Sequence, residues 1–190
     1  MKIHHTNIYK IGPYSAHLKA LTPEDKISRF GYPASDHSID QMVLNMCYHP
    51  ADHELWYARD DGDRVGWGHL AKNDDDSWEL AVSVEKAFQR QGIGNQLIVE
   101  MLAWAKFHHI HHVYLQCIEG NRVIQHLANK NDLKTRSIGG GERTASIELS
   151  EPTLLESNTQ LFKEQKEIFD EFGKLRNRLT KLWVTPILPK

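Results

Sequence analysis

The chain has 190 residues, of which 40% are hydrophobic and 25% are charged, and its formal net charge at pH 7 is −2. This length suits one globular domain with an appendage, and the composition excludes a disordered protein. The small negative charge argues against a nucleic-acid-binding surface. The sequence has neither a run of about 18 apolar residues nor an apolar signal core behind Met1, so we expect no membrane span and a cytoplasmic location.

The first segments predict two helices. Thr22 as N-cap and Pro23 at the first helical position predict a helix that continues towards Phe30. A second helix, over residues 38–47, is predicted by apolar residues at helical spacing: Ile39, Met42, Val43 and Met46.

The pattern then changes to that of an antiparallel meander. Residues 54–59 and 64–71 flank the turn 60–63 as a predicted hairpin, and residues 78–84 form a third strand. The remaining predicted elements are a helix over 95–107, a strand over 112–117, a helix over 122–130 with Asn121 near its N-cap, and strands over 133–138 and 144–149.

The residues between the third strand and the next helix read Gln89-Arg-Gln-Gly-Ile-Gly94. Two glycines separated by one residue let the chain curl tightly, so that successive main-chain N–H groups can point at one anion. The following helix adds the positive end of its dipole, equivalent to about half a charge. The sequence therefore predicts a phosphate-binding turn, and the alternative is an ordinary strand-to-helix turn that carries two glycines.

Two other phosphate motifs do not fit this turn. The dinucleotide-binding fingerprint needs a third small residue where this chain has Leu97, and the P-loop needs a Gly-Lys-Ser/Thr ending that is absent from the turn. The spacing Gln/Arg-x-x-Gly-x-Gly/Ala between a strand and a helix instead resembles the acyl-CoA pyrophosphate signature of the GNAT N-acetyltransferase superfamily. The order of the predicted elements also resembles that family.

Three further segments resemble the bacterial protein lysine acetyltransferase (Pat-type) branch of the family. They are Trp78-Glu-Leu-Ala-Val, the Asn121-Arg helix with its Leu-Ala ending, and Leu21-Thr-Pro-Glu-Asp followed by Arg29-Phe. The resemblance covers roughly residues 15–150, and we expect a GNAT domain over 1–150 with a separate C-terminal element over 151–190.

The resemblance implies the fold and the coenzyme site. The fold would be α/β (α+β), with a central mixed, mostly antiparallel sheet, flanking helices and one splayed strand pair that holds the pantetheine arm of acetyl-CoA. The implied coenzyme contacts are Val82, Val84, Gln89, Arg90, Gln91, Gly92, Ile93, Gly94, Asn95 and Asn121.

Acetyl transfer to an amine needs a base, because an amine with a pKa near 10.4 is almost fully protonated at neutral pH. Glu79 matches the Glu that the Pat-type branch is thought to use for this purpose. We expect its carboxylate to be surrounded by Trp78, Leu80 and Val82, and such apolar surroundings make a carboxylate a stronger base. The alternative places Glu79 on the solvated face of an alternating strand.

The chain departs from the wider family at two positions. Many members carry a Tyr seven residues after the conserved Asn, where it protonates the departing thiolate, but this position is Ala128. The Gly-Phe that ends the same helix in many members is replaced by Asp132-Leu133. No general acid is therefore assigned.

Histidine and cysteine do not predict a metal site. The run His108-His-Ile-His-His spans a helix end and a strand start, where neighbouring side chains diverge, so we expect no metal. Cys47 and Cys117 are too few for a disulfide framework and are expected to be reduced, buried thiols. The acidic runs 60–63 and 74–76 could attract a cationic amine, although hairpin turns also favour Asp.

Beyond Pro152 the sequence predicts an amphipathic helix of about six turns that Pro186 ends. Its apolar residues recur at heptad spacing, and Gln165 interrupts them once. They are Leu161, Ile168, Phe172, Leu175, Leu179 and Leu182. The helix would form a homodimer seam or fold back on its own domain.

These observations favour an N-acetyltransferase that moves an acetyl group from acetyl-CoA to a primary amine, either a protein lysine or a small amine, by direct attack with Glu79 as base. The alternative is a catalytically decayed CoA-binding regulatory domain with an oligomerising C-terminal helix. A pure interaction protein is a third reading.

Overall fold

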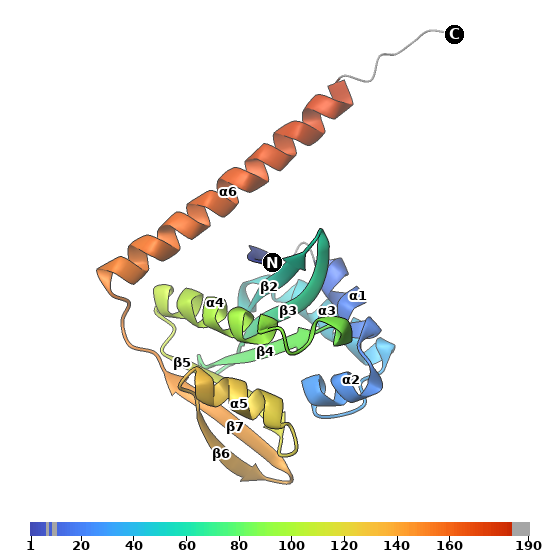
Figure 1. The fold of residues 1–190 in the computed structure, drawn as a ribbon, viewed down its shortest axis with the longest axis vertical. Helices are drawn as coiled ribbons and strands as arrows, with labels where there is room; N and C mark the ends of the chain where they lie inside the picture. Colours follow the sequence, from blue (N-terminus) through green and yellow to red (C-terminus); the bar gives the residue numbers. More distant parts are fainter. Residues whose placement is uncertain (7, 9–10, 184–190) are drawn as a thin grey trace. The chain divides into compact units, whose positions relative to one another are not determined.

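A computed structural model describes residues 1–6, 8 and 11–183, and their side chains except those of 171 and 180–183. The chain divides into two compact units, Met1–Pro152 and Thr153–Lys190. The first unit contains a seven-stranded sheet, and the second contains one long helix (Figure 1).

The strands of the sheet lie in the order β1-β2-β3-β4-β5-β7-β6. All neighbouring pairs are antiparallel except β4 and β5, which are parallel. The strands are β1 (Lys2–Thr6), β2 (His53–Asp60), β3 (Asp63–Lys72), β4 (Trp78–Val84), β5 (His112–Ile118), β6 (Lys134–Gly139) and β7 (Glu142–Glu148). The predicted fold class, a mostly antiparallel mixed sheet with flanking helices and a long C-terminal helix, is therefore confirmed.

In the described part of the first unit, five α-helices cover the sheet, together with the short 3-10 helices η2 (Pro50–Asp52) and η3 (Lys86–Phe88). They are α1 (Ile11–Ala20), α2 (Pro23–Phe30), α3 (Asp36–Tyr48), α4 (Ile93–Phe107) and α5 (Arg122–Lys130). Side-chain caps start three of them. The oxygens of Thr22, Ser35 and Asn121 accept from the main-chain N–H three residues further on, which satisfies one free donor of each first turn.

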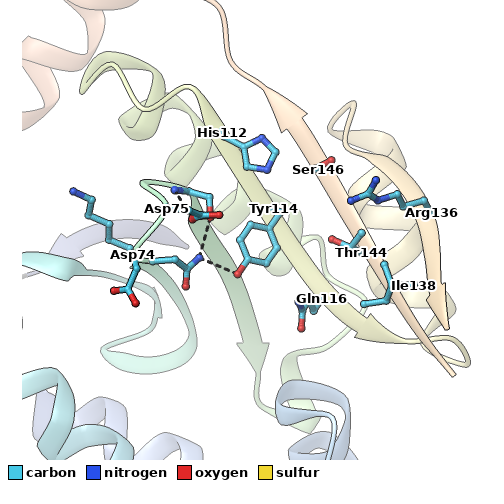
Figure 2. A pocket seen from close by; sticks show the side chains of 12 residues that line it. Asp74, Asp75, His112, Tyr114, Gln116, Arg136, Ile138, Thr144 and Ser146 are labelled. Carbon is cyan, nitrogen blue, oxygen red and sulfur yellow. Dashed lines mark hydrogen bonds between the residues drawn. The ribbon is translucent and has the colours of Figure 1, made fainter. Parts of the chain in front are cut away.

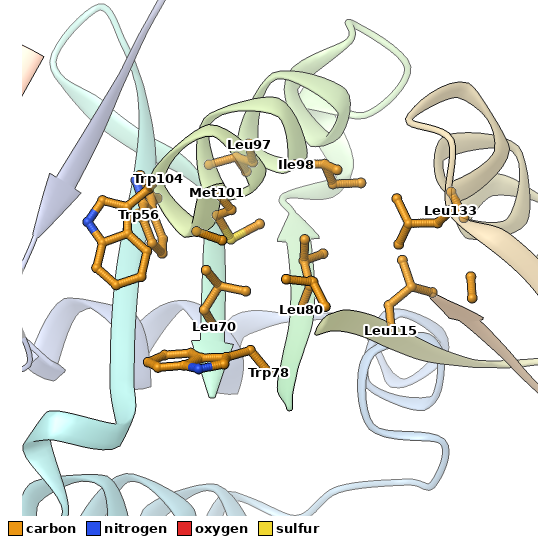
Figure 3. Close-up of a cluster of buried hydrophobic side chains, with 14 of the residues drawn as sticks. Trp56, Leu70, Trp78, Leu80, Leu97, Ile98, Met101, Trp104, Leu115 and Leu133 are labelled. Carbon is orange, nitrogen blue, oxygen red and sulfur yellow. The ribbon is translucent and has the colours of Figure 1, made fainter. Parts of the chain in front are cut away.

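Two hydrophobic clusters lie on opposite faces of the sheet. The larger joins α4 and α5 to β2, β3, β4 and β5, and its centre is Leu97, Ile98, Met101 and Trp104 of α4 (Figure 3). The other packs α1 and α3 against β2 and β3 through residues such as Tyr14, Ile39 and Trp67.

The structure adds two elements that the sequence did not predict. Strand β1 reads Lys-Ile-His-His-Thr, which has one aliphatic residue and no clear alternation, and it forms only by pairing with β2. Helix α1 contains Gly12 and Pro13, which weaken the helical signal. Cys117 is buried, but Cys47 is exposed, so the expectation of two buried thiols was wrong for Cys47.

The second unit is the helix α6 (Leu154–Trp183). Its 30 residues make about eight turns, so the prediction of about six was too short. Thr153 and Glu156 form a reciprocal capping box, in which the Thr153 hydroxyl accepts from Glu156 N (3.3 Å) and the Glu156 carboxylate accepts from Thr153 N (2.7 Å). The predicted stop at Pro186 and the side chain of Leu182 lie outside the described part of the chain.

Several large apolar side chains of α6 are exposed: Leu154, Leu155, Leu161, Phe162, Ile168, Phe169, Phe172, Leu175 and Leu179. They follow the predicted heptad spacing and widen it by one flanking row. No helix in the described part of the chain combines the length and the apolar character needed to cross a lipid bilayer.

Candidate functional site

The parallel strands β4 and β5 separate along their length. Each strand has seven residues, but only Trp78↔Val113 and Glu79↔Tyr114 are in register as pairs. From Leu80 to Val84, β4 therefore has no partner strand on the β5 side among the described residues, although it remains paired with β3 through Val84. This is the splayed pair that the sequence predicted.

The main chain of β4 faces its two neighbours alternately. Glu85 N donates to Val65 O of β3 (2.9 Å), so the N–H and C=O groups of Val84, Val82 and Leu80 point to the other side, towards β5. The Val84 carbonyl accepts a hydrogen bond from Gln89 Nε2 (3.1 Å). The main-chain polar groups of Val82 and Val84 are thus turned into the splayed region, and their contact with a coenzyme stays a prediction.

The turn after β4 gathers main-chain donors. Gly92 is the N-cap of α4 with φ 82°, and Arg90 also has a positive φ of 62°. The first main-chain bond of the helix runs from Gln96 N to Gly92 O. The N–H groups of residues 93–95 have no acceptor in the described part of the chain, as expected for a first helical turn. Three N–H donors and the positive end of the helix dipole therefore meet at this turn.

Gln89 fixes the turn to its surroundings. Its side-chain amide donates both to Val84 O and to Asp25 Oδ1 of α2 (3.0 Å). The neighbouring side chains of Arg90 and Gln91 are both exposed, and Gln91 Nε2 donates to Ala87 O (3.4 Å). The predicted residues of the turn are therefore brought together, with Arg90 and Gln91 on its outer side.

The second half of the turn lies inside α4, which begins at Ile93 and not at Asn95. The Ile93 side chain is buried in the larger core cluster and anchors the turn. A Cβ atom at Gly94 would lie 3.3 Å from Leu127 Cδ1, so this glycine permits close contact between α4 and α5. Asn95 Oδ1 accepts from Asn131 Nδ2 (3.2 Å) at the same contact.

Asn121 lies at the start of α5, just beyond β5. Its Oδ1 accepts from Ile124 N (3.1 Å), so the side chain acts as a helix cap. Its Nδ2 has no acceptor within the described residues and stays available to a ligand. The cap explains the choice of Asn without requiring a coenzyme contact.

Glu79 occupies the last paired position before β4 and β5 separate. Trp78 and Leu80 point to the opposite face of the sheet, into the cluster beneath α4. The expected apolar surroundings of Glu79 were therefore wrong. Its carboxylate is partly exposed and shares a face with Tyr114, because residues paired in register point to the same side of a sheet.

A pocket of about 600 Å³ opens on this face (Figure 2). It is lined by the β3–β4 loop and by β5, β6 and β7, with Lys72, Asn73, Asp74, Asp75, Ser77, His112, Tyr114, Gln116, Arg136, Ile138, Thr144 and Ser146. The Tyr114 hydroxyl accepts from Asn73 Nδ2 (2.9 Å), which leaves its own proton to be donated. Burial, and then the negative charge of Glu79, raises the pKa of Tyr114 above its usual 10.

This pocket was not predicted from the sequence. Its walls come from four elements whose proximity depends on the crossover from β5 to β7. One available signal was the alternation in β5, where the polar Tyr114 and Gln116 alternate with the buried Val113, Leu115 and Cys117.

A buried imidazole on the same face was also missed. His17 of α1 lies 2.9 Å (Nε2) from Ser83 Oγ on β4. Burial and the nearby charge of Arg29 lower the pKa of His17 from 6.5 to about 4, so the ring is neutral at neutral pH. It links α1 to the splayed part of β4.

Ala128 is fully buried in the core, and its methyl group cannot protonate a leaving thiolate. The histidine run diverges as expected. His108 Nδ1 contacts Trp104 O (2.9 Å), His109 Nδ1 contacts Glu151 Oε2 (2.7 Å), and His112 Nδ1 contacts Glu148 Oε1 (2.5 Å). In the described residues, no group of three or more His, Cys, Asp or Glu side chains could hold a metal ion.

Comparison with known proteins identifies the family of this chain. The profile of the Acetyltransferase (GNAT) family matches residues 20–132. A search of curated proteins found no match.

Solved structures of similar fold share little sequence with this chain. The GNAT domain of S. lividans PAT aligns with a TM-score of 0.65 and 17% identity over 77% of this chain and 89% of that one. Ribosomal-protein-alanine N-acetyltransferase from Brucella melitensis aligns with a TM-score of 0.59 and 16% identity over 78% of this chain and 100% of that one. The yncA protein from Salmonella typhimurium, solved with its cofactor acetyl-CoA, aligns with a TM-score of 0.59 and 11% identity over 80% of this chain and 96% of that one. At such identities the likeness shows the fold alone.

Proposed function

Because this chain belongs to the acetyltransferase (GNAT) family, we propose that it moves an acetyl group from acetyl-CoA to a primary amine. The single observation that carries the proposal is the coincidence of two features. The main-chain donors of residues 93–95 lie at one end of the splayed strands, and Glu79 lies at the other.

The donor turn suits the pyrophosphate of the coenzyme. Free N–H groups at a helix N-terminus bind phosphate oxygens without any basic side chain. Gly92 has the left-handed conformation that the turn requires, and its missing side chain leaves the approach open. Residues 89–95 would hold the coenzyme chiefly through their main chain, and the exposed Arg90 adds a positive charge beside the site.

The splayed strands suit the pantetheine arm. The arm has a backbone of about twelve atoms, which equals about four residues of extended chain or about 14 Å. The stretch of β4 from Val84 to Glu79 covers a similar length, about 17 Å. An arm that starts at the turn and runs along Val82 would therefore bring its thioester close to Glu79, and Asn121 Nδ2 could contact it from the β5 side.

Glu79 would then serve as the base. In direct attack, the amine nitrogen bonds to the thioester carbon, the C–S bond breaks, and the amine loses a proton. The Glu79 carboxylate takes this proton, directly or through one water molecule. No side chain protonates the leaving thiolate in this scheme, which is tolerable because a thiol with a pKa near 8.5 leaves readily.

The test is a paired substitution. Thiol release from acetyl-CoA is followed with a mixed amine library, and acetylated products are identified by mass spectrometry. We expect Glu79→Gln to lower kcat/KM about a hundredfold or more while the Kd for CoA is unchanged. The matched control is Glu142→Gln, because Glu142 is an exposed residue of β7, on the side of β5 away from β4, and does not line the pocket. Equal activity of both variants would contradict the assignment of Glu79.

A decayed regulatory domain is the second candidate, and the lack of a proton donor at Ala128 favours it. In that case CoA would bind at the donor turn, but no amine would accelerate thiol release. Tight CoA binding without turnover in the same assay would select this function. A failure of CoA to raise the melting temperature would contradict both candidates.

For α6 we propose a second copy of the same helix as partner. The exposed large apolar residues in the described part of the sheet unit are spread over separate elements and loops, and they do not share one helix face as those of α6 do. They are Met1, Tyr32, Leu44, Tyr48, Val99, Val123 and Ile138. A parallel, in-register pair of helices would place each Gln165 against its own copy, as polar residues in heptad cores do. Light scattering on the wild type and Ile168→Lys should give a dimer and a monomer, and a monomeric wild type at high concentration would contradict the proposal.

A further inference from the structure

The pocket of Figure 2 is connected to the base through one side chain. Tyr114 lines the pocket and is also the in-register partner of Glu79. The two groups are close enough for the Glu79 charge to raise the pKa of Tyr114. A molecule in the pocket could therefore reach Glu79 past the phenol ring.

Most charges in the pocket lining are already compensated. Lys72 Nζ pairs with Asp76 (2.7 Å), and His112 pairs with Glu148. Asp75 accepts from the hydroxyl (2.5 Å) and the main-chain N–H (3.0 Å) of Ser77.

Two opposite charges remain. Arg136 on β6 and Asp74 in the β3–β4 loop form no ion pair in the described part of the chain. Figure 2 shows them on opposite sides of the pocket, with Tyr114 and Gln116 between them. Asp74 lies on the same side of the pocket as Glu79, because Asp74 belongs to the loop before β4 and Glu79 is the second residue of β4.

We propose that this pocket binds the acceptor, and that the acceptor is a small amino-acid-like molecule whose carboxylate is held by Arg136. The inference rests on the proposed acetyl transfer. A guanidinium binds a carboxylate through two parallel hydrogen bonds, so it suits this group better than a point charge does. The ammonium end would point to the acidic side, towards Tyr114 and Glu79.

The size and polarity of the pocket fit such a ligand. A volume of about 600 Å³ lies in the range of small-molecule sites. The wall between the two charges offers neutral hydrogen-bonding groups, namely Gln116, Thr144 and Ser146. A lysine within a protein would present an ammonium but no nearby carboxylate, and would leave Arg136 without its partner.

The first experiment measures binding without turnover. A set of free L-amino acids is titrated by calorimetry into the full-length protein saturated with CoA, alongside the matched amines that lack the carboxylate, such as L-lysine against 1,5-diaminopentane. We expect at least one amino acid to bind, and its matched amine to bind about ten to a hundred times more weakly. Arg136→Gln should remove this difference.

The matched control is Arg64→Gln, since Arg64 stacks on the Tyr57 ring on β2, outside the pocket. Arg136 is exposed on its strand, so the variant should keep the wild-type melting temperature. Equal binding of amino acids and matched amines, or no binding of any amino acid, would overturn the inference.

The second experiment measures acetyl transfer with the same acceptors and with a lysine in an uncharged peptide. Arg136→Gln should raise the KM of carboxylate-bearing acceptors about tenfold or more and leave kcat and the KM for acetyl-CoA unchanged. Transfer that favours the peptide in the wild type would overturn the inference and retain the proposed function. Absence of transfer to every amine would refute the proposed function, while calorimetry would still decide the pocket's ligand.

Discussion

Acidification should lower the stability of the folded protein, because the contact between α1 and the splayed part of β4 contains a buried, neutral imidazole. His17 is buried, and its Nε2 lies 2.9 Å from Ser83 Oγ. Burial, with the charge of Arg29, lowers the pKa of His17 from 6.5 to about 4 in the folded protein. The unfolded chain takes up the proton near the ordinary value. The stability that His17 contributes is therefore complete above that pH and is lost as the pH falls towards the folded value.

The size of the effect follows from the two pKa values. Once the pH is below both, the loss is at most about 3 kcal/mol. Between about pH 7.5 and about pH 5, where the folded protein still holds the ring neutral, it is about 2 kcal/mol. This is a large share of the stability of an ordinary domain, which is about 5–15 kcal/mol.

The assay compares urea unfolding of the wild type and His17→Gln at these two pH values. Gln keeps a donor for Ser83 but does not titrate. We expect the wild type to lose about 2 kcal/mol more than the variant on acidification. His69, whose burial also lowers its pKa, titrates in both proteins and cancels in the difference. Equal losses in the two proteins would refute the reasoning.

Two further predictions concern glycines. Gly92→Ala should cost about 1 kcal/mol of stability and weaken CoA binding about tenfold by calorimetry, because φ at Gly92 is 82°. The control Gly12→Ala, which places no atom within 4 Å of the new Cβ, should bind CoA like the wild type. Unchanged CoA binding in Gly92→Ala would contradict the role of the turn. Gly68→Ala should cost about 1–3 kcal/mol in urea unfolding, because its methyl group would lie 2.7 Å from Met101 Sδ. That cost should nearly vanish in a Met101→Ala background, and equal costs in both backgrounds would exclude the clash as the cause.

Much of the fold could be predicted because its signals are local. The N-cap Thr22 with Pro23 marks the start of α2, and the two glycines of the turn mark the start of α4 to within two residues. The apolar segments of β2, β3 and β4, separated by turns rich in Asp, mark the strands. Each of these signals lies within a few residues of the feature that it predicts.

The candidate site could be predicted only in part, because faces and pockets depend on distant segments. The sequence identified Glu79 but not the side of the sheet on which it would lie. Arg136 and Asp74 are 62 positions apart in the numbering and become walls of one pocket only through the strand order β5-β7-β6. His17 and Ser83 likewise meet only because α1 packs on that face. The roles of Glu79, of residues 89–95 and of Asn121 stay predictions.

The first turn of α6 is closed by residues of its own segment. Starting a helix is its costly step, and here the bonds between Thr153 and Glu156 supply the necessary partners within four consecutive residues. The segment after Pro152 would thus begin its helix at the same residue behind any other carrier. A transfer of this segment to another protein would therefore carry the start signal of the helix with it.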